Sequence, residues 1–180
     1  MNRSRISSKN IAYVALGTAL IALSALISLP FAIPFTLQTF GVFAVLLVLG
    51  GNRGVCAVAV YILLGLIGLP IFSGFQSGLS AILGATGGFI IGFAIASLIF
   101  WLFEALFGKR TSSRIVAVII GMIACYCVGS VWYFFYIGES GFQGFVAALS
   151  VCVIPYLIPD ALKICAAFWV ARAVSKAIKA

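Results

Sequence analysis

Two oppositely charged residues, Asp160 and Lys163, stand inside an apolar segment near the C-terminus. At a spacing of three on a helix, their side chains share one face. A carboxylate accepts hydrogen bonds from N–H groups, whereas an ammonium donates them to a carbonyl or carboxylate. Pro155 and Pro159 precede the pair and predict a helix break that frees backbone groups for a ligand. Asp160 and Lys163 together suit a small ligand that carries both donors and acceptors.

The depth of this pair in a membrane bears on its role. If Arg172 marks the cytoplasmic end of the segment, Asp160 lies about 18 Å from that end and Lys163 about 13 Å, at 1.5 Å per residue. A charge at such depth costs at least about 2.5–3.5 kcal/mol on insertion scales. Two explanations stay open: an ion pair that only braces the bundle, and the polar floor of a cavity that opens to the outside. We favour the second, because ionisable groups within a membrane usually serve function.

Two uncharged loops, residues 28–38 and 70–82, offer the remaining walls of such a cavity. Both mix aromatic side chains with amides and hydroxyls, which is typical of a small-molecule site. Ordinary loop packing is an equal alternative for any single loop residue, and anchoring at the membrane surface is the alternative for the tyrosines. Beside Asp160 and Lys163, the candidate ligand-binding residues are Phe35, Thr36, Gln38, Gln76, Ser77, Tyr126 and Tyr156.

The composition indicates the kind of structure that must position these residues. Apolar residues make up 64% of the 180-residue chain and charged residues only 8%. A soluble domain needs a more charged exterior, whereas a bilayer tolerates this surface. The apolar runs are continuous rather than alternating, which favours helices over a membrane β-barrel. We predict an all-α integral membrane protein with six transmembrane helices, built as one domain over residues 1–180.

Six spans fit the apolar runs, although two of them are short. A span of residues 39–49 would cover only about 17 Å, and a bilayer core is about 30 Å thick. The outer loop beside it should therefore dip into the protein and leave the outer face indented. The predicted spans are residues 10–27, 39–49, 55–69, 82–107, 115–137 and 145–173.

The charges indicate how the spans are oriented. The connections between alternate spans hold ten of the eleven basic residues, whereas the only charge in the other three connections is Glu139. By the positive-inside rule, both termini are cytoplasmic in a multi-pass protein of the cell membrane. This placement also argues against nucleic-acid binding, despite a net charge of +8. The ten residues are Arg3, Arg5, Lys9, Arg53, Lys109, Arg110, Arg114, Arg172, Lys176 and Lys179.

Several kinds of chemistry lack their usual residues. The chain has no histidine, and none of its five cysteines forms a C-x-x-C pair, so we expect neither a metal site nor a cofactor. It has no G-x-x-x-x-G-K-[ST] motif for ATP. An intramembrane enzyme is one alternative class, but the sequence offers no nucleophile–base set. We therefore expect a protein that is not an enzyme.

Small residues recur at helical spacing in three spans, which lets helices approach closely in lipid. The lines in the fourth and fifth spans predict internal packing: Gly84, Gly88, Gly92 and Ala96, then Gly121, Cys125 and Gly129. For the line in the first span, internal packing and docking of another membrane protein are equally favoured. That line consists of Ala12, Ala15, Ala19 and Ala22.

Four stretches carry a family resemblance: PFTLQTF at 34–40, YILLGLIGLPIF at 61–72, LGATGGFIIGF at 83–93, and Pro159-Asp160-x-x-Lys163. Together they resemble the BioY family, the biotin-binding substrate components (S components) of energy-coupling factor (ECF) transporters. The resemblance covers nearly the whole chain. Ala85 departs from it, since the family pattern has proline before Thr86.

The resemblance implies a six-helix protein with an outward-facing biotin site that includes the Asp160–Lys163 pair. It also implies partners: a transmembrane coupling protein, docked on the alanine face of the first span, and two ATPase subunits. The sequence leaves open which end of biotin meets Lys163. The alternatives are an S component for another small vitamin and a membrane assembly subunit with no transport role.

Overall fold

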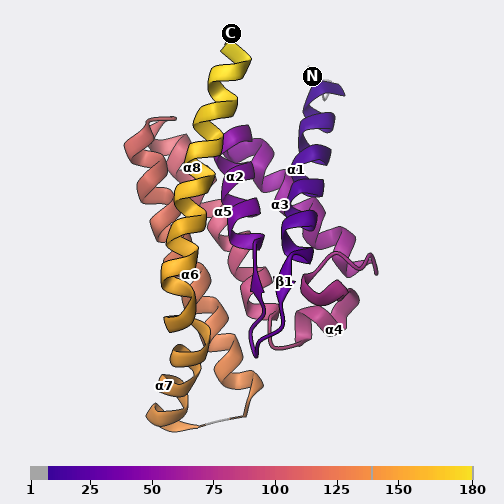
Figure 1. Cartoon of the computed structure of the whole chain (residues 1–180), viewed down its shortest axis with the longest axis vertical. Helices are drawn as coiled ribbons and strands as arrows, with labels where there is room; N and C mark the ends of the chain where they lie inside the picture. The colour runs from indigo at the N-terminus through magenta and orange to yellow at the C-terminus, as the bar shows by residue number, and fades with distance from the viewer. Residues whose placement is uncertain (1–7, 139, 180) are drawn as a thin grey trace, which may run out of the picture.

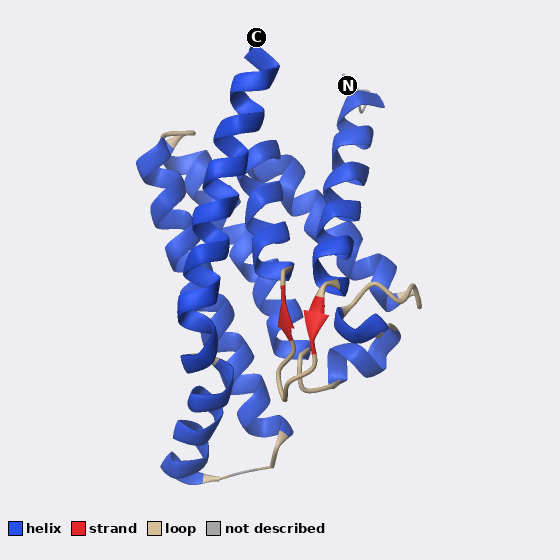
Figure 2. Ribbon diagram, viewed as in Figure 1, coloured by secondary structure: helices blue, strands red, loops and turns tan. Residues whose placement is uncertain are grey.

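The computed structural model describes residues 8–138 and 140–179 of the chain, with the side chains of residues 178 and 179 left out. The side chains of Arg3, Arg5, Glu139 and Lys179, whose charges entered the predicted orientation, therefore lie outside the described part of the structure. Within the described part, the fold is helical with one short hairpin (Figures 1 and 2). The elements are α1 (Ser8–Leu26), β1 (Ser28–Leu29), β2 (Phe35–Thr36), α2 (Gln38–Leu49), α3 (Gly51–Leu66), η1 (Ser73–Phe75), α4 (Gly78–Leu83), α5 (Gly87–Phe107), α6 (Thr111–Tyr136), α7 (Gly141–Cys152), η2 (Ile154–Tyr156) and α8 (Leu157–Lys179).

The helices match the apolar runs of the sequence. Four helical stretches in the described part are long and apolar enough to cross a membrane: Ser8–Leu26, Gly87–Phe107, Thr111–Tyr136 and Gly141–Ala177. The helices α2 and α3 are apolar but shorter, as predicted for the second and third spans. The connection between the predicted spans 39–49 and 55–69 is shorter than predicted, because α3 already begins at Gly51 and Gly50 alone, at φ 79°, makes the turn.

The fourth span was predicted as continuous over residues 82–107, and this is wrong. The chain ends α4 at Leu83 and begins α5 at Gly87. The carbonyl of Gly84, at this break, accepts hydrogen bonds from the Gly87 N–H at 3.1 Å and from Trp132 Nε1 at 2.9 Å. At Gly87 a Cβ atom would lie 1.6 Å from the Ile82 carbonyl oxygen. Only glycine therefore permits this tight return of the chain.

The sixth span is also divided, into α7 and α8 with the short η2 between them. Pro155 lies within η2, so the predicted break is present there. Pro159 does not break the chain, because it lies in the first turn of α8, where the N–H that proline lacks has no helical partner. Asp160 therefore lies in the first turn of a new helix. The helix dipole favours a carboxylate at that end.

The small residues of α5 and α6 pack against one another, which confirms the internal-packing interpretation for all of them except Gly84, which lies before α5. Gly88 lies against the Trp132 side chain, and Gly92 lies against Cys125. A Cβ atom on Gly92 would be 2.9 Å from the Cys125 Cα atom, so the two helix backbones are in close contact. This contact fixes the two helices that carry much of the site described below.

The helix α1 packs against the bundle mainly through a face other than its alanine line. Its buried residues are Gly17, Thr18, Ile21, Ser24 and Ala25, and Thr18 Oγ1 donates a hydrogen bond to the Ala57 carbonyl at 3.0 Å. Three residues of the alanine line are exposed and the fourth is partly exposed: Ala12, Ala15, Ala19 and Ala22. Ala12, Ala15 and Ala19 therefore face away from the core of this chain, whereas Ala22 packs against it.

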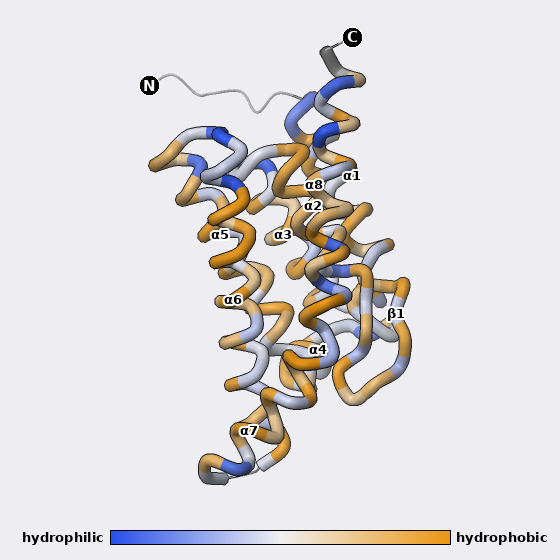
Figure 3. The backbone as a smooth tube through the Cα atoms, turned by 60° about the vertical axis from the view of Figure 1, so that its left-hand side comes forward, coloured by the Kyte–Doolittle hydropathy of each residue, from blue (hydrophilic) through white to orange (hydrophobic). Residues whose placement is uncertain are grey.

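One end of the bundle carries both ends of the described chain and the α5–α6 turn (Figure 1), and Figure 3 shows hydrophilic residues gathered there. An ion pair that the sequence reasoning missed joins two turns at this end. Arg114 Nη2 lies 2.6 Å from Glu104 Oε1, and the Gly51 N–H donates to Glu104 Oε2 at 2.7 Å. Arg114 Nη1 also donates to the Leu47 carbonyl at 3.4 Å. Glu104 and Arg114 thus bind the α2–α3 turn to α5 and α6.

The β1–β2 hairpin and α4 lie toward the opposite end of the bundle, and the α6–α7 arm extends beyond them (Figure 1). The hairpin pairs Ser28 with Thr36 and Leu29 with Phe35 in antiparallel register. It brings the loop before α2 back onto the bundle, in line with the expectation that a short second span needs an inward-dipping loop.

Candidate ligand-binding site

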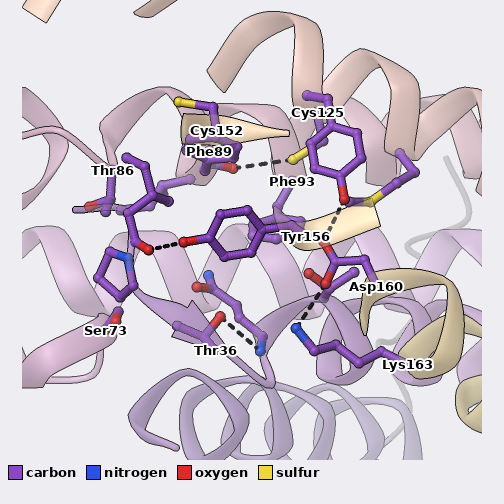
Figure 4. Close-up of a pocket in the computed structure, with 17 residues that line it drawn as sticks. Thr36, Ser73, Thr86, Phe89, Phe93, Cys125, Cys152, Tyr156, Asp160 and Lys163 are labelled. Atoms are coloured by element: carbon purple, nitrogen blue, oxygen red, sulfur yellow. Dashed lines mark hydrogen bonds and ion pairs between the residues drawn. The ribbon is translucent and has the colours of Figure 1, made fainter. Parts of the chain in front are cut away.

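A cavity of about 60 Å³ lies between the hairpin, α2, η1, α5, α6 and α8 (Figure 4). The only charged residues that line it are Asp160 and Lys163. Their side chains are 7% and 8% exposed, and Lys163 Nζ lies 2.8 Å from Asp160 Oδ1. The predicted pair therefore exists, and it forms part of a cavity wall.

Asp160 is held from two helices. Within α8 it pairs with Lys163, and from α6 the Tyr126 hydroxyl donates a hydrogen bond to Asp160 Oδ2 at 2.7 Å. A carboxylate offers about four acceptor positions, so each oxygen can accept one further hydrogen bond. The site thus holds a buried carboxylate in a fixed position with unused acceptor capacity.

Lys163 has a second contact besides Asp160. Its Nζ lies 3.9 Å from the centre of the Phe35 ring, a cation–π contact. The Phe35 ring stacks on Tyr156, with the ring centres 6.2 Å apart, and the Tyr156 hydroxyl donates to the Ile33 carbonyl. Of the three N–H donors of an ammonium, one is occupied by Asp160. The hairpin is thereby joined to α8 and η2, with Phe35 in contact with the charged pair.

The start of α2 supplies the amide group of the site. Gln38 is buried, and its Nε2 donates to the Tyr61 hydroxyl at 3.1 Å. Tyr61 in turn donates to the Ile71 carbonyl at 3.3 Å, so the amide orientation is fixed from α3. The hydroxyl of Thr36 accepts a hydrogen bond from the Gln38 N–H at 3.2 Å. Both Thr36 and Gln38 line the cavity.

Apolar side chains form much of the remaining wall. Phe89, Ile90 and Phe93 come from α5, and Met122 comes from α6. Glycines on α5 and α6 allow the close approach of these helices, and this brings the apolar side chains to the same cavity. An apolar wall with a few fixed polar groups binds a small molecule and selects its orientation.

The structure brings most, but not all, of the predicted residues together. Thr36, Gln38, Tyr126, Tyr156, Asp160 and Lys163 line the cavity, and Phe35 contacts two of them. Gln76 and Ser77 do not line it, and Gln76 is exposed. The reason is the tight η1 turn, which ends before Gln76 and directs the chain toward α4.

Sequence reasoning missed Ser73 and Thr86, which also line the cavity. Ser73 belongs to the predicted loop, but a loop of mixed polarity does not reveal which of its hydroxyls turns inward. The sequence offered one signal, which is that Ser73 directly follows the aromatic Phe72. In the structure Phe72 is buried, with 1% of its surface exposed. Thr86 lay inside a span that was predicted as continuous. Because the helix break at residues 84–86 was not predicted, Thr86 was not recognised as a cavity residue.

Comparisons with known proteins agree with one another. The model of a family described as the BioY family matches residues 1–180. A probable biotin transporter BioY of Pyrococcus horikoshii is 35% identical over 168 residues, which cover 93% of this chain and 96% of that protein. The biotin transporter BioY of Thermotoga maritima is 35% identical over 162 residues, which cover 88% and 91%.

The fold has a counterpart among solved structures. A crystal structure of the S-component for biotin from an ECF-type ABC transporter superimposes with a TM-score of 0.77. The match covers 100% of this chain and 95% of the other, at 24% sequence identity. At that identity the superposition establishes a shared fold.

Proposed function

This chain belongs to the BioY family, and from that premise we propose that it is the biotin-binding S component of an ECF-type transporter. The observation that carries the proposal is the buried Asp160–Lys163 pair, held by Tyr126 in the wall of a cavity. In this role the protein captures biotin on the outer side of the cell membrane, and separate subunits supply the energy.

The chemistry of biotin fits the groups that line the cavity. Its cyclic urea has two N–H donors and one carbonyl acceptor, and a carboxylate ends its aliphatic chain. Asp160 has free acceptor positions for a urea N–H, and Lys163 has free donors for an acceptor group. The thioether ring of biotin can pack on Phe89 and Phe93, since sulfur and aromatic rings attract one another. The binding therefore needs no metal and no covalent step.

The cavity has to enlarge when the ligand enters. Its volume of about 60 Å³ is well below the roughly 300–1,000 Å³ typical of small-molecule sites. The hairpin closes the cavity through the contacts of Ile33 and Phe35 with Tyr156. These are contacts of a small hairpin rather than of a long helix, so the hairpin is the element that we expect to move outward.

We also propose the finer topology that the fold leaves open: six membrane spans in one domain over residues 1–180, with both termini in the cytoplasm. Four long apolar helices and the shorter α2 and α3 support the count. The position of both described ends beside the basic α5–α6 turn supports the orientation (Figures 1 and 3), because cytoplasmic connections carry the excess of Lys and Arg.

The partners follow from the proposed role. An S component depends on a transmembrane coupling protein and two ATPase subunits, and this chain carries no ATP-binding motif in its sequence. We propose the exposed alanine line of α1 as the surface that meets the coupling protein. Its small side chains allow close helix contact in lipid, and Ala12, Ala15 and Ala19 are exposed rather than covered by this chain.

The docking proposal predicts separate effects on assembly and on binding. The double variant Ala15→Leu/Ala19→Leu should lose most of its co-purification with the coupling protein and its biotin uptake, because the larger side chains keep the helices apart. Its affinity for biotin in the isolated form should not change, since α1 does not line the cavity. Leu20→Phe, at an exposed position more than a quarter turn from Ala19, is the control. Normal assembly of the double variant would refute this surface.

The function itself is tested by titrating purified protein in detergent with biotin. We expect a saturable response at micromolar biotin or below, in tryptophan fluorescence and in calorimetry. Calorimetry is needed because Trp101, Trp132 and Trp169 do not line the cavity. Thiamine and riboflavin, which lack a cyclic urea beside an aliphatic acid, serve as controls. A response to one of these and none to biotin would assign the protein to another vitamin, and no response to any would contradict the proposed function.

A further inference from the structure

One hydroxyl of the cavity wall is fully buried and still has no hydrogen-bond partner. Ser73 is 9% exposed, lines the cavity, and its Oγ atom is buried without a partner. In the described part of the chain, the only other buried side-chain polar atom without a partner is Ser130 Oγ, and Ser130 does not line the cavity. Buried polar groups are nearly always paired, so an unpaired one calls for an explanation.

The backbone around Ser73 holds this hydroxyl in place. The preceding Phe72 is buried edge-on against Tyr61, with the ring centres 5.4 Å apart, and it fills the space beside Gly65. After Ser73 the chain turns through Gly74 at φ 67° and Phe75 at φ 59°. A positive φ at a residue such as phenylalanine stores strain, and such strain gathers at ligand-binding sites. The anchor and the turn together keep Ser73 at the cavity wall.

A second hydroxyl lies on the same side of the cavity. In Figure 4, Ser73 and Thr86 lie on one side of the Tyr156 ring, and Asp160 and Lys163 lie on the other. Thr86 precedes the first turn of the 21-residue helix α5, and its side chain makes no capping hydrogen bond. The N-terminus of such a helix carries partial positive charge and favours an anion. This side of the cavity thus offers hydroxyl donors, a positive dipole end and no carboxylate.

We propose that Ser73, together with Thr86 at the start of α5, forms a second polar subsite that takes the carboxylate end of the ligand. The inference rests on the proposed function, since it assumes a ligand with a polar group at each end. The Asp160–Lys163 pair then takes the other polar end. Lys163 already balances the charge of Asp160, so the pair has no excess positive charge for a carboxylate.

The test compares two ligands on one variant. We expect Ser73→Ala to weaken biotin binding on the order of tenfold, as for the loss of a hydrogen bond to a charged group. Biotin methyl ester, which lacks the negative charge, should bind the native protein more weakly than biotin does. Ser73→Ala should change the affinity for the ester by less than threefold. Thr86→Val, which keeps the side-chain shape, should show the same pattern.

Thermal unfolding without ligand provides the independent readout. Because Ser73→Ala removes an unpaired buried hydroxyl, the midpoint should stay unchanged or rise, whereas a structural role would lower it. Ser80→Ala is the matched control, since Ser80 is exposed and outside the cavity. Equal losses for biotin and its ester, no loss for either, or a lowered midpoint would each overturn the subsite while the proposed function stands. Failure of the native protein to bind biotin would refute the proposed function and this inference with it.

Discussion

Replacing Asp160 by Asn, or Lys163 by Met, is expected to weaken biotin binding by roughly 1.5–3 kcal/mol each, the contribution of a hydrogen bond to a charged group. Both side chains are buried in the cavity wall and retain unused hydrogen-bonding capacity. Each single change also leaves the partner buried without its counter-charge, which costs roughly 3–5 kcal/mol of stability. Calorimetric titration with biotin and thermal unfolding of the same samples measure the two effects.

The double variant Asp160→Asn/Lys163→Met separates ligand binding from bracing. With both charges gone, no buried charge lacks its partner, so stability should recover much of its native value while biotin affinity stays low. Lys176→Met is the matched control, because Lys176 is exposed on the same helix and should change neither quantity. Single variants that lose stability but keep native affinity would show that the pair only braces the bundle.

Replacing Arg114 by Met is expected to destabilise the protein by about 3 kcal/mol, at the lower end of the range for breaking a buried ion pair. Glu104 is 6% exposed and would be left unpaired, whereas Arg114 is 23% exposed and so begins partly solvated. The Leu47 carbonyl at the end of α2 would lose a donor as well. The midpoint of thermal unfolding in detergent is the measurement.

Arg110→Met is the matched control for this change, because Arg110 is an exposed arginine directly before α6, the helix that carries Arg114. The double variant Glu104→Gln/Arg114→Met should regain part of the lost stability, since no charge is then buried alone. Biotin affinity should be preserved in every variant that stays folded, because Glu104 and Arg114 lie outside the cavity. An Arg114→Met protein as stable as the Arg110→Met protein would show that the ion pair contributes little.

Local sequence patterns predicted the helices well where a single physical signal dominated. Long apolar runs without charges give helices in any bilayer-like environment, and the short run before Gly50 correctly predicted a short second helix. Small residues at spacing four predicted the α5–α6 contact, because close helix packing in lipid requires them. The Asp160–Lys163 contact was predictable for a similar reason, since spacing along one helix fixes it.

The breaks within helices were harder to predict because they depend on distant partners. At the interruption after Leu83, the Gly84 carbonyl accepts one hydrogen bond from the nearby Gly87 N–H and a second from the Trp132 indole, which lies far along the chain. The glycines alone did not predict this break, since a glycine inside an apolar run is equally typical of close packing between helices. Pro159 misled in the opposite direction, because proline in the first turn of a helix breaks nothing.

The sequence by itself determined the class of protein, the helical spacing that pairs Asp160 with Lys163, and the family resemblance. These follow from composition and from contacts within one element, which are local. Only the tertiary structure decided which loop residues face the cavity, namely Ser73 and not Gln76 or Ser77. It also decided the contacts between elements, of Tyr126 with Asp160 and of Phe35 with Lys163. The physical reason is that a loop side chain is directed by a turn and by contacts with remote helices, and no spacing along the chain encodes these.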